Sequence, residues 1–377
     1  MNTKINFDFT YIRGRVGLYA FLKALGVGRG DEVVLQAYTC FSFPEAILAT
    51  GARAVYVDVA SGGINMDTGL LGQQLTSRTR AIIAQHTFGI PAKMDQIMEV
   101  ADEHGVPVIE DCAHSFWSEY DGKRVGHIGA ATAYSFEWTK PLPLGIGGAL
   151  VVRDDGLRRK IRSAYQQLEL PPARRDRKMQ LQYLAFSLLY KPERFWSVKK
   201  LNRFLSRGEQ AGMRLDLGPS GLGDYRLRML PSVSRRMKRR LPGLQPDWDR
   251  NREIIAAYRR GIAGAVSEIP VPQKARTMYA RYPFWIDDKE AMLSRARSVG
   301  YELGDWFLSP VSPLTGENLS LAGYETGMCP NAERACRHVV SLPCNERVSV
   351  AACERFMSKL TSSPRRAVDG SLAHQKS

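Results

Sequence analysis

Two ionisable side chains follow apolar stretches that have the composition of buried strands. The stretch 106–111 ends in Asp111, and the stretch 131–136 is followed four residues later by Lys140. A lysine reaches its neutral, nucleophilic form more easily near low-dielectric surroundings, because burial disfavours the ammonium ion. If the two strands are neighbours in a parallel sheet, their carboxyl ends meet at one edge and Asp111 could face Lys140.

A lysine that faces a carboxylate suits the chemistry of pyridoxal 5'-phosphate (PLP). The lysine amine can form an imine with the cofactor aldehyde, and the carboxylate keeps a proton on the pyridine nitrogen, which then draws electrons from a carbanion. A single lysine after a strand is usually a surface residue. The prediction of a PLP site therefore rests on its combination with Asp111, His114, Ser135 and the glycine-rich turn Gly145–Gly148.

Strands and helices alternate in the half of the chain that must position these side chains. β-rich stretches are predicted at 33–36, 54–59, 81–86, 106–111, 131–136 and 149–153, and helices at 17–25, 44–50 and 94–104. This alternation predicts an α/β fold with a mostly parallel sheet flanked by helices. Ligands of such sheets bind at the carboxyl ends of the strands, where Asp111, His86 and Ser135 are expected.

The pattern changes after about residue 153, where long basic helices begin. The sequence predicts a large cofactor-binding domain over 1–246, with a basic helical insertion at about 155–220. A smaller α+β domain is predicted over 247–360, followed by a polar, disordered tail over 361–377.

Positive charge is concentrated in the middle of the chain. The whole chain has a formal charge of +15, and residues 151–260 hold 27 Lys+Arg against 11 Asp+Glu. Aromatic residues alternate with cations over 181–205, which suits an anionic membrane surface or a nucleic acid. A solvated helical face is the plainer alternative. No nucleic-acid-binding motif accompanies the charge, so we expect no nucleic acid partner.

The composition excludes several other classes of protein. The chain is 44% hydrophobic and 24% charged, which is typical of a globular protein. It contains no apolar stretch of the ~20 residues that a spanning helix needs, and its first residues do not have the pattern of a secretory signal. Its six cysteines form no Cys-x-x-Cys pair. We therefore expect reduced thiols, no metal site and a cytoplasmic location.

Taken in order, the motifs resemble those of the DegT/DnrJ/EryC1/StrS family of sugar aminotransferases, which are PLP enzymes of the aspartate-aminotransferase fold (fold type I). The resemblance covers residues 14–152 well and 282–360 more loosely. It rests on Glu110-Asp111-Cys112-Ala113-His114, Ser135-Phe136-x-x-x-Lys140, Gly145-Ile146-Gly147-Gly148, Pro330-Asn331-Ala332-Glu333 and Ser341-Leu342-Pro343.

The resemblance implies a role for each matching residue at the cofactor. Lys140 would form the internal Schiff base and move the proton during transfer. Asp111 would pair with the pyridine nitrogen, and His114 would lie beside the 3-hydroxyl. Gly14 and Ser135 would hold the phosphate.

The resemblance also implies contacts further from the reacting carbon. Thr39 and Cys40 lie in the loop where an aromatic residue normally stacks on the cofactor ring. Asp224 stands where an asparagine normally reaches the phosphate of the partner subunit, which implies a homodimer with shared sites. The predicted substrate contacts are His86, Tyr225 and Arg226.

Two positions of the cofactor site depart from the family pattern. The Ser-Gly-Thr phosphate loop reads Arg13-Gly14-Arg15 here, and Arg15 could bind phosphate as a charged fork, helped by the following helix N-terminus. Cys40 cannot stack like an aromatic ring, so we expect Tyr38 or Phe41 to replace it.

A third departure lies at Asp224. Aspartate in place of asparagine brings negative charge toward a phosphate. Arg226 and Arg228 are the expected compensating cations.

By resemblance, the chain is expected to transfer an amino group, with glutamate as the donor, to a keto-sugar that is nucleotide-linked. Such reactions supply amino sugars for polysaccharide, lipopolysaccharide or antibiotic synthesis. Lys140 argues against a related sugar dehydratase, in which histidine replaces the lysine. A non-catalytic or regulatory member, and a basic protein that binds nucleic acid or a membrane surface, remain as alternatives.

Overall fold

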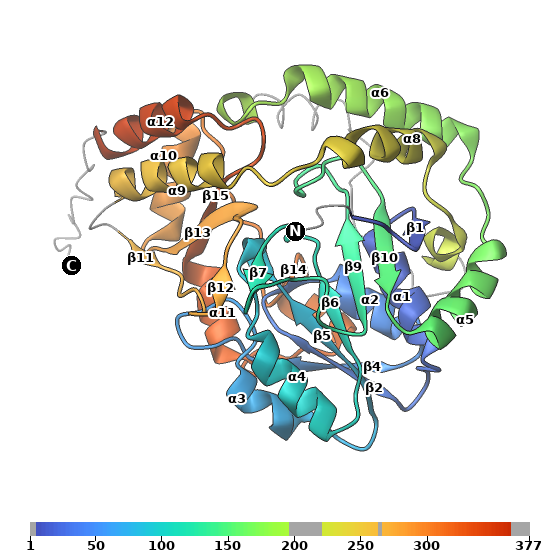
Figure 1. The fold of residues 1–377 in the computed structure, drawn as a ribbon. Helices are drawn as coiled ribbons and strands as arrows, with labels where there is room; N and C mark the ends of the chain where they lie inside the picture. Colours follow the sequence, from blue (N-terminus) through green and yellow to red (C-terminus); the bar gives the residue numbers. More distant parts are fainter. Residues whose placement is uncertain (1–4, 196–220, 263–265, 363–377) are drawn as a thin grey trace, which may run out of the picture.

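The computed structural model describes residues 5–195, 221–262 and 266–362 (Figure 1). Its centre is a seven-stranded sheet in the order β1-β10-β9-β6-β5-β2-β4. The strands, in that order, are Phe9–Tyr11, Gly148–Val152, Ala131–Ser135, Val108–Asp111, Thr79–Gln85, Glu32–Gln36 and Arg53–Val57. The five strands from β9 to β4 are parallel, whereas β10 and β1 are antiparallel to their neighbours.

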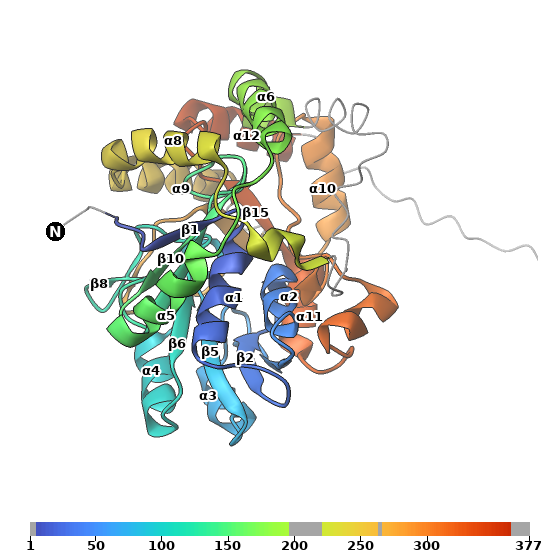
Figure 2. The same ribbon diagram turned by 90° about the vertical axis from the view of Figure 1, so that its right-hand side faces the viewer.

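Helices cover both faces of this sheet, as expected for buried parallel strands. One face carries α1 and α2 and the opposite face carries α3 and α4 (Figures 1 and 2). Their bounds are Gly14–Ala24, Ser42–Leu48, Thr68–Leu71 and Met94–Glu103. The α/β fold with a mostly parallel sheet is confirmed, and each predicted strand matches one of its strands to within a few residues. The sequence did not predict β1, because a strand of three residues is too short to show an alternation of apolar and polar side chains.

A second hydrophobic cluster lies around a small antiparallel sheet, β11-β13-β15. The strands are Ser267–Glu268, Arg281–Trp285 and Val339–Pro343, and the helices packed with them are α9 (Trp248–Ile262), α10 (Lys289–Ser298) and α12 (Val350–Ser362). However, side chains between Phe307 and Val339, including those of α11 (Pro330–His338), belong to the cluster of the large sheet. The division into 1–246 and 247–360 therefore stays a prediction. The predicted tail beyond Ser362 lies outside the described residues.

Two small sheets complete the β structure of the described residues: β12-β7-β8 and β14-β3. Their strands are β12 (Ala275–Arg276), β7 (Glu119–Tyr120), β8 (Lys123–Arg124), β14 (Val311–Ser312) and β3 (Thr39–Cys40). The parallel pairing of β3 with β14 ties the loop after β2 to the chain just beyond Phe307.

The basic middle of the chain forms helices at the periphery. These are α5 (Asp155–Gln166), α6 (Ala173–Leu189) and α8 (Pro231–Arg240), and a short 3-10 turn covers Gly221–Arg226. α6 and α8 lie side by side at the edge of the molecule (Figures 1 and 2). Residues 196–205 of the predicted aromatic and basic stretch lie outside the described residues. No helix in the described parts of the chain is both long and apolar enough to cross a bilayer.

Candidate active site

A cavity opens at the carboxyl ends of β6 and β9, where the fold rule for parallel sheets places ligands. Asp111 is the last residue of β6, Ser135 is the last residue of β9, and Lys140 lies on the turn that follows β9. The cavity is lined by Arg13, Gly14, Arg15, Cys40, Ser42, Phe43, Gln85, Asp111, Ala113, His114, Ala133, Tyr134, Ser135, Glu137, Lys140 and Phe307.

Lys140 and His114 are in direct contact within this cavity. Lys140 Nζ lies 2.8 Å from His114 Nε2 and 5.4 Å from the centre of the Trp306 ring. The N–H of Phe88 donates to His114 Nδ1 at 3.3 Å, which assigns the ring proton to Nε2. Burial, followed by the nearby charges of Lys140 and Arg281, holds the pKa of His114 well below its usual value. The imidazole is therefore neutral and adds no second positive charge beside the lysine amine.

Asp111 is buried at the floor of the cavity. Its carboxylate accepts the N–H of Ala113 at 2.8 Å. Burial raises the pKa of Asp111 to about 6, because that hydrogen bond and the charge of Lys140 offset only part of the desolvation. A buried carboxylate in this position is stabilised by any ligand that brings a positively charged N–H group to it.

The other end of the cavity is formed by the start of α1. Gly14 is the first residue of α1 and packs against Gly148 of β10, where a Cβ atom would lie only 2.2 Å from Gly14 Cα. This close approach requires glycine and brings the first turn of α1 next to Ser135. A helix N-terminus with a serine hydroxyl beside it is suited to a phosphate group.

Arginine side chains surround this anion-binding end, and carboxylates hold them in place. Arg15 Nη1 donates to Glu45 Oε2 at 2.7 Å. Arg13 Nε donates to Asp224 Oδ2 at 2.8 Å, and Arg175 Nη1 donates to Asp224 Oδ1 at 2.6 Å. Although burial raises it, the hydrogen bonds from Arg175 and Arg13 lower the pKa of Asp224 to about 2. The carboxylates of Glu45 and Asp224 therefore hold these arginine side chains in position and neutralise part of their positive charge.

Residues 10–361 match the DegT/DnrJ/EryC1/StrS aminotransferase family. The chain belongs to this family. Over 145 residues it is 41% identical to the spore coat polysaccharide biosynthesis protein SpsC of Bacillus subtilis, a match that covers 38% of this chain and 37% of SpsC. Over 153 residues it is 37% identical to GDP-perosamine synthase of Escherichia coli O157:H7, covering 41% and 42% of the two chains. The match thus spans about two fifths of these relatives.

A solved structure resembles the whole fold. The aminotransferase TlmJ of Streptoalloteichus hindustanus superposes with a TM-score of 0.66 at 26% identity, covering 93% of this chain and 84% of TlmJ. The mostly parallel sheet flanked by helices is therefore the PLP-transferase architecture predicted from the sequence.

The residues around the cavity fit PLP, the cofactor of this family. They offer a lysine amine for an aldehyde, a buried carboxylate for a ring N–H, and a helix N-terminus with a serine for a phosphate. Lys140, Asp111 and Ser135 would therefore hold the three polar ends of the cofactor.

The structure brings seven of the predicted site residues to the cavity: Lys140, Asp111, His114, Ser135, Gly14, Arg15 and Cys40. Five others do not line it, and these are Thr39, Asp224, His86, Tyr225 and Arg226. Thr39 is buried and donates to Gln85 at 2.7 Å, and the Tyr225 hydroxyl lies 3.4 Å from Glu45. These contacts make both residues supports of the cavity wall within this chain.

The expected compensation of Asp224 by Arg226 and Arg228 is corrected by the structure. Asp224 pairs with Arg13 and Arg175 instead. Arg226 points outward and is exposed, and Arg228 donates to the carbonyl of Gln166 at 2.9 Å. The short 3-10 turn directs residue 224 and residue 226 to different sides, which spacing alone does not reveal.

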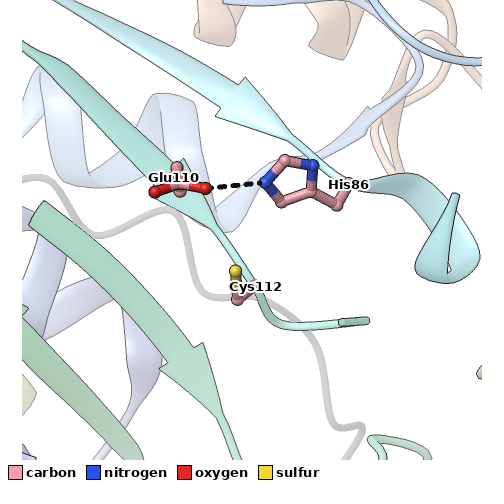
Figure 3. A group of neighbouring side chains, drawn as sticks. All are labelled: His86, Glu110 and Cys112. Atoms are coloured by element: carbon pink, nitrogen blue, oxygen red, sulfur yellow. Dashed lines mark hydrogen bonds and ion pairs between the residues drawn. The ribbon is translucent and has the colours of Figure 1, made fainter. Parts of the chain in front are cut away.

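His86 belongs to a buried network rather than to the cavity. Its Nδ1 accepts the N–H of Ala92 at 3.1 Å, and its Nε2 lies 3.3 Å from Glu110 (Figure 3). His86 is completely buried, so the predicted contact with substrate does not fit its position.

His86, Glu110 and Cys112 have the residue types and the proximity of metal ligands. The acceptor atoms of His86 and Glu110 are already engaged, however, because His86 Nδ1 accepts from Ala92 and Glu110 also accepts the N–H groups of Gly126, Ile128 and Gly129.

We expect Glu110→Gln to destabilise the fold without touching the cavity. Hydrogen bonds from His86 and from backbone N–H groups outweigh burial and hold the pKa of Glu110 below its usual value. An amide NH₂ would face some of these donors, and the loss is about 3 kcal/mol in the free energy of unfolding. Urea unfolding measures it, with exposed Glu99→Gln on α4 as the control. Equal stability of the two variants would contradict the structural role.

Two aromatic residues were missed by the sequence reasoning, one that lines the cavity and one that lies beside Lys140. The expected replacements for a stacking ring, Tyr38 and Phe41, do not line the cavity, whereas Phe307 does and packs against Tyr38 with ring centres 4.4 Å apart. Trp306 lies 5.3 Å from the His114 ring. Nothing in the sequence marks residues 306–307 as neighbours of Lys140, because they come from a distant loop.

Proposed function

We propose that the protein is a PLP-dependent aminotransferase that transfers an amino group from glutamate to a nucleotide-linked keto-sugar. The observation that carries this proposal is the meeting of Lys140, Asp111 and Ser135 at the carboxyl ends of adjacent strands. The matched relatives include a synthase of GDP-perosamine and a spore coat polysaccharide biosynthesis protein. We accordingly place the reaction in polysaccharide or amino-sugar biosynthesis.

The side chains of the cavity would each have a separate role in such a transfer. When bound, PLP supplies an electron sink that stabilises negative charge on the carbon carrying the amine. Lys140 would anchor the cofactor and carry the proton to and from that carbon, within reach of His114 Nε2. Asp111 would keep a proton on the ring nitrogen, and the first N–H groups of α1 would hold the phosphate with Ser135.

We further propose a cytoplasmic homodimer. In this arrangement Arg226 would act at the site of the partner subunit, since it does not reach the cavity of its own chain. The exposed position of Arg226 is compatible with such a contact. Sedimentation velocity and cross-complementation of a Lys140→Ala subunit by an Arg226→Ala subunit would test the shared site.

Two half-reactions test the catalytic proposal separately. Glutamate added to the cofactor-loaded protein is expected to bleach the visible absorption and release 2-oxoglutarate. Nucleotide-linked 3-keto- and 4-keto-sugars are then expected to restore the absorption in proportion to amino-sugar formed, which mass spectrometry identifies. A protein that binds PLP but performs neither half-reaction with any donor would be a non-catalytic member of the family.

Asp224→Asn is expected to tighten the binding of PLP by about three- to tenfold. The aspartate shares Arg13 with the anion-binding end of the cavity, so an amide would leave more positive charge for the phosphate. Fluorescence titration of the cofactor-free protein measures the Kd, with exposed Asp249→Asn as a control for the change in net charge. Weaker binding by Asp224→Asn would mean that the carboxylate positions Arg13 rather than competing for it.

A further inference from the structure

The outward face of α6 is unusually apolar for a solvated helix. Nine large apolar side chains are exposed in the described part of the chain, and five of them lie between residues 170 and 189. They are Leu170, Leu181, Leu184, Leu188 and Leu189, with 67%, 69%, 57%, 69% and 42% of their surface exposed. Positions 181, 184 and 188 form one stripe, because residues three and four apart lie on the same side of a helix.

The opposite face of α6 packs against the rest of the protein, so the exposed stripe lies on the face that points away from it. Asp176 accepts the N–H of Ser232 in α8 at 2.9 Å. The Tyr183 and Phe186 rings pack against Trp138, with centres 6.2 Å and 4.8 Å apart. The helix is thereby held against α8 and against the turn that carries Lys140.

Positive charge flanks the stripe. The N-terminal half of α6 exposes Arg174, Arg177 and Lys178, whereas its only acid, Asp176, faces inward. α8, which lies beside α6, contains no acidic residue and exposes three more cations, Arg235, Lys238 and Arg239. Outside residues 151–260 the chain holds 26 Lys+Arg against 27 Asp+Glu. The net positive charge of the chain therefore lies within the segment 151–260, which includes α6 and α8.

From this combination we propose that the outward face of α6 docks on an anionic membrane surface. Leu181, Leu184 and Leu188 would enter the boundary between headgroups and acyl chains, and the cations of α6 and α8 would contact the anionic headgroups. A helix of 17 residues, about 25 Å long, can lie flat on such a surface. Leucines next to cations match a lipid surface better than a second protein copy, because the same basic surface on two copies would repel. The inference does not depend on the proposed catalysis.

Co-sedimentation of the full, cofactor-loaded protein with vesicles tests the docking. We expect binding to vesicles of phosphatidylcholine mixed with phosphatidylglycerol, little binding to phosphatidylcholine alone, and release by salt. The triple variant Leu181→Gln, Leu184→Gln, Leu188→Gln should bind at least about tenfold less, because it loses the apolar contact. Leu321→Gln, an exposed leucine elsewhere in the described chain, is the matched control.

The contribution of charge is tested by Arg174→Gln, Arg177→Gln, Lys178→Gln, which should also lower binding about tenfold or more at low salt. The control removes three exposed cations from α9 instead: Arg252→Gln, Arg259→Gln, Arg260→Gln. Equal losses in the two variants, or equal binding to both kinds of vesicle, would overturn the proposal. A leucine variant that changes the oligomeric state in sedimentation velocity would identify the stripe as a protein interface and would also overturn it.

Discussion

Lys140→Ala is expected to lower the rate of amino transfer by about 10⁴-fold or more. Proton transfer by a positioned side chain alone contributes about 10²- to 10⁴-fold, and the variant also loses covalent attachment of PLP. Lys140 lines the cavity, and its Nζ lies 2.8 Å from His114 Nε2, so its amine is placed where the proposed cofactor would bind. The expected result is therefore a protein that still folds and binds PLP weakly but cannot turn over.

The visible absorption spectrum before and after borohydride measures this effect directly. The wild-type protein should show a visible band that borohydride bleaches, with the cofactor then attached to a peptide containing Lys140. Lys140→Ala should retain no attached cofactor after denaturation, whereas exposed Lys93→Ala should behave like wild type. Attachment that persists in Lys140→Ala would place the reactive lysine elsewhere. A wild-type protein that stays colourless with added PLP would remove the cofactor from the proposed function.

Asp111→Asn is expected to lower the rate of amino transfer by about 10²- to 10³-fold, the usual effect of removing one preorganised electrostatic contact. An amide cannot keep the ring nitrogen protonated, so the ring would accept electrons less well. Single-turnover reaction with glutamate isolates this step from product release. Exposed Asp102→Asn on α4 serves as the control. A rate within a few-fold of wild type would show that Asp111 does not contact the ring nitrogen.

Although Asp111→Asn should lower the rate, it is expected to raise the stability of the cofactor-free fold at neutral pH. Burial raises the pKa of Asp111 to about 6 in the cofactor-free fold, whereas in the unfolded chain the carboxyl loses its proton at about pH 4. Between these values the folded state binds more protons, so the stability contributed by Asp111 falls as pH rises. Cofactor-free Asp111→Asn should then exceed wild type above pH 7 by up to about 3 kcal/mol, and the difference should vanish near about pH 4.

Urea unfolding across that pH range measures the effect. Adding PLP should stabilise the wild type more than Asp111→Asn, because the ring N–H compensates the buried carboxylate. A cofactor-free variant less stable than wild type at neutral pH would show that the carboxylate is already compensated by Lys140 and Ala113.

The meeting of Asp111, Ser135 and Lys140 in one cavity could be predicted because these residues lie at or close to strand ends. Asp111 and Ser135 are the last residues of β6 and β9, and Lys140 follows within five residues. Buried strands are visible in a sequence as apolar stretches, and parallel strands must align their carboxyl ends. The same reasoning was misleading for His86, which also follows a strand. Its imidazole turns toward Glu110, inside the fold, instead of toward the cavity.

By itself, the sequence determined the order of strands and helices along the chain and the α/β class, and it placed Asp111, Ser135 and Lys140 at or just after strand ends, because each of these features depends on a local pattern. Only the tertiary structure decided which cation meets which carboxylate. Arg15 and Glu45 are 30 residues apart, and Arg13 and Asp224 are 211 apart. Such pairs, and the approach of Phe307 to the cavity, depend on how distant elements pack, which no local pattern records.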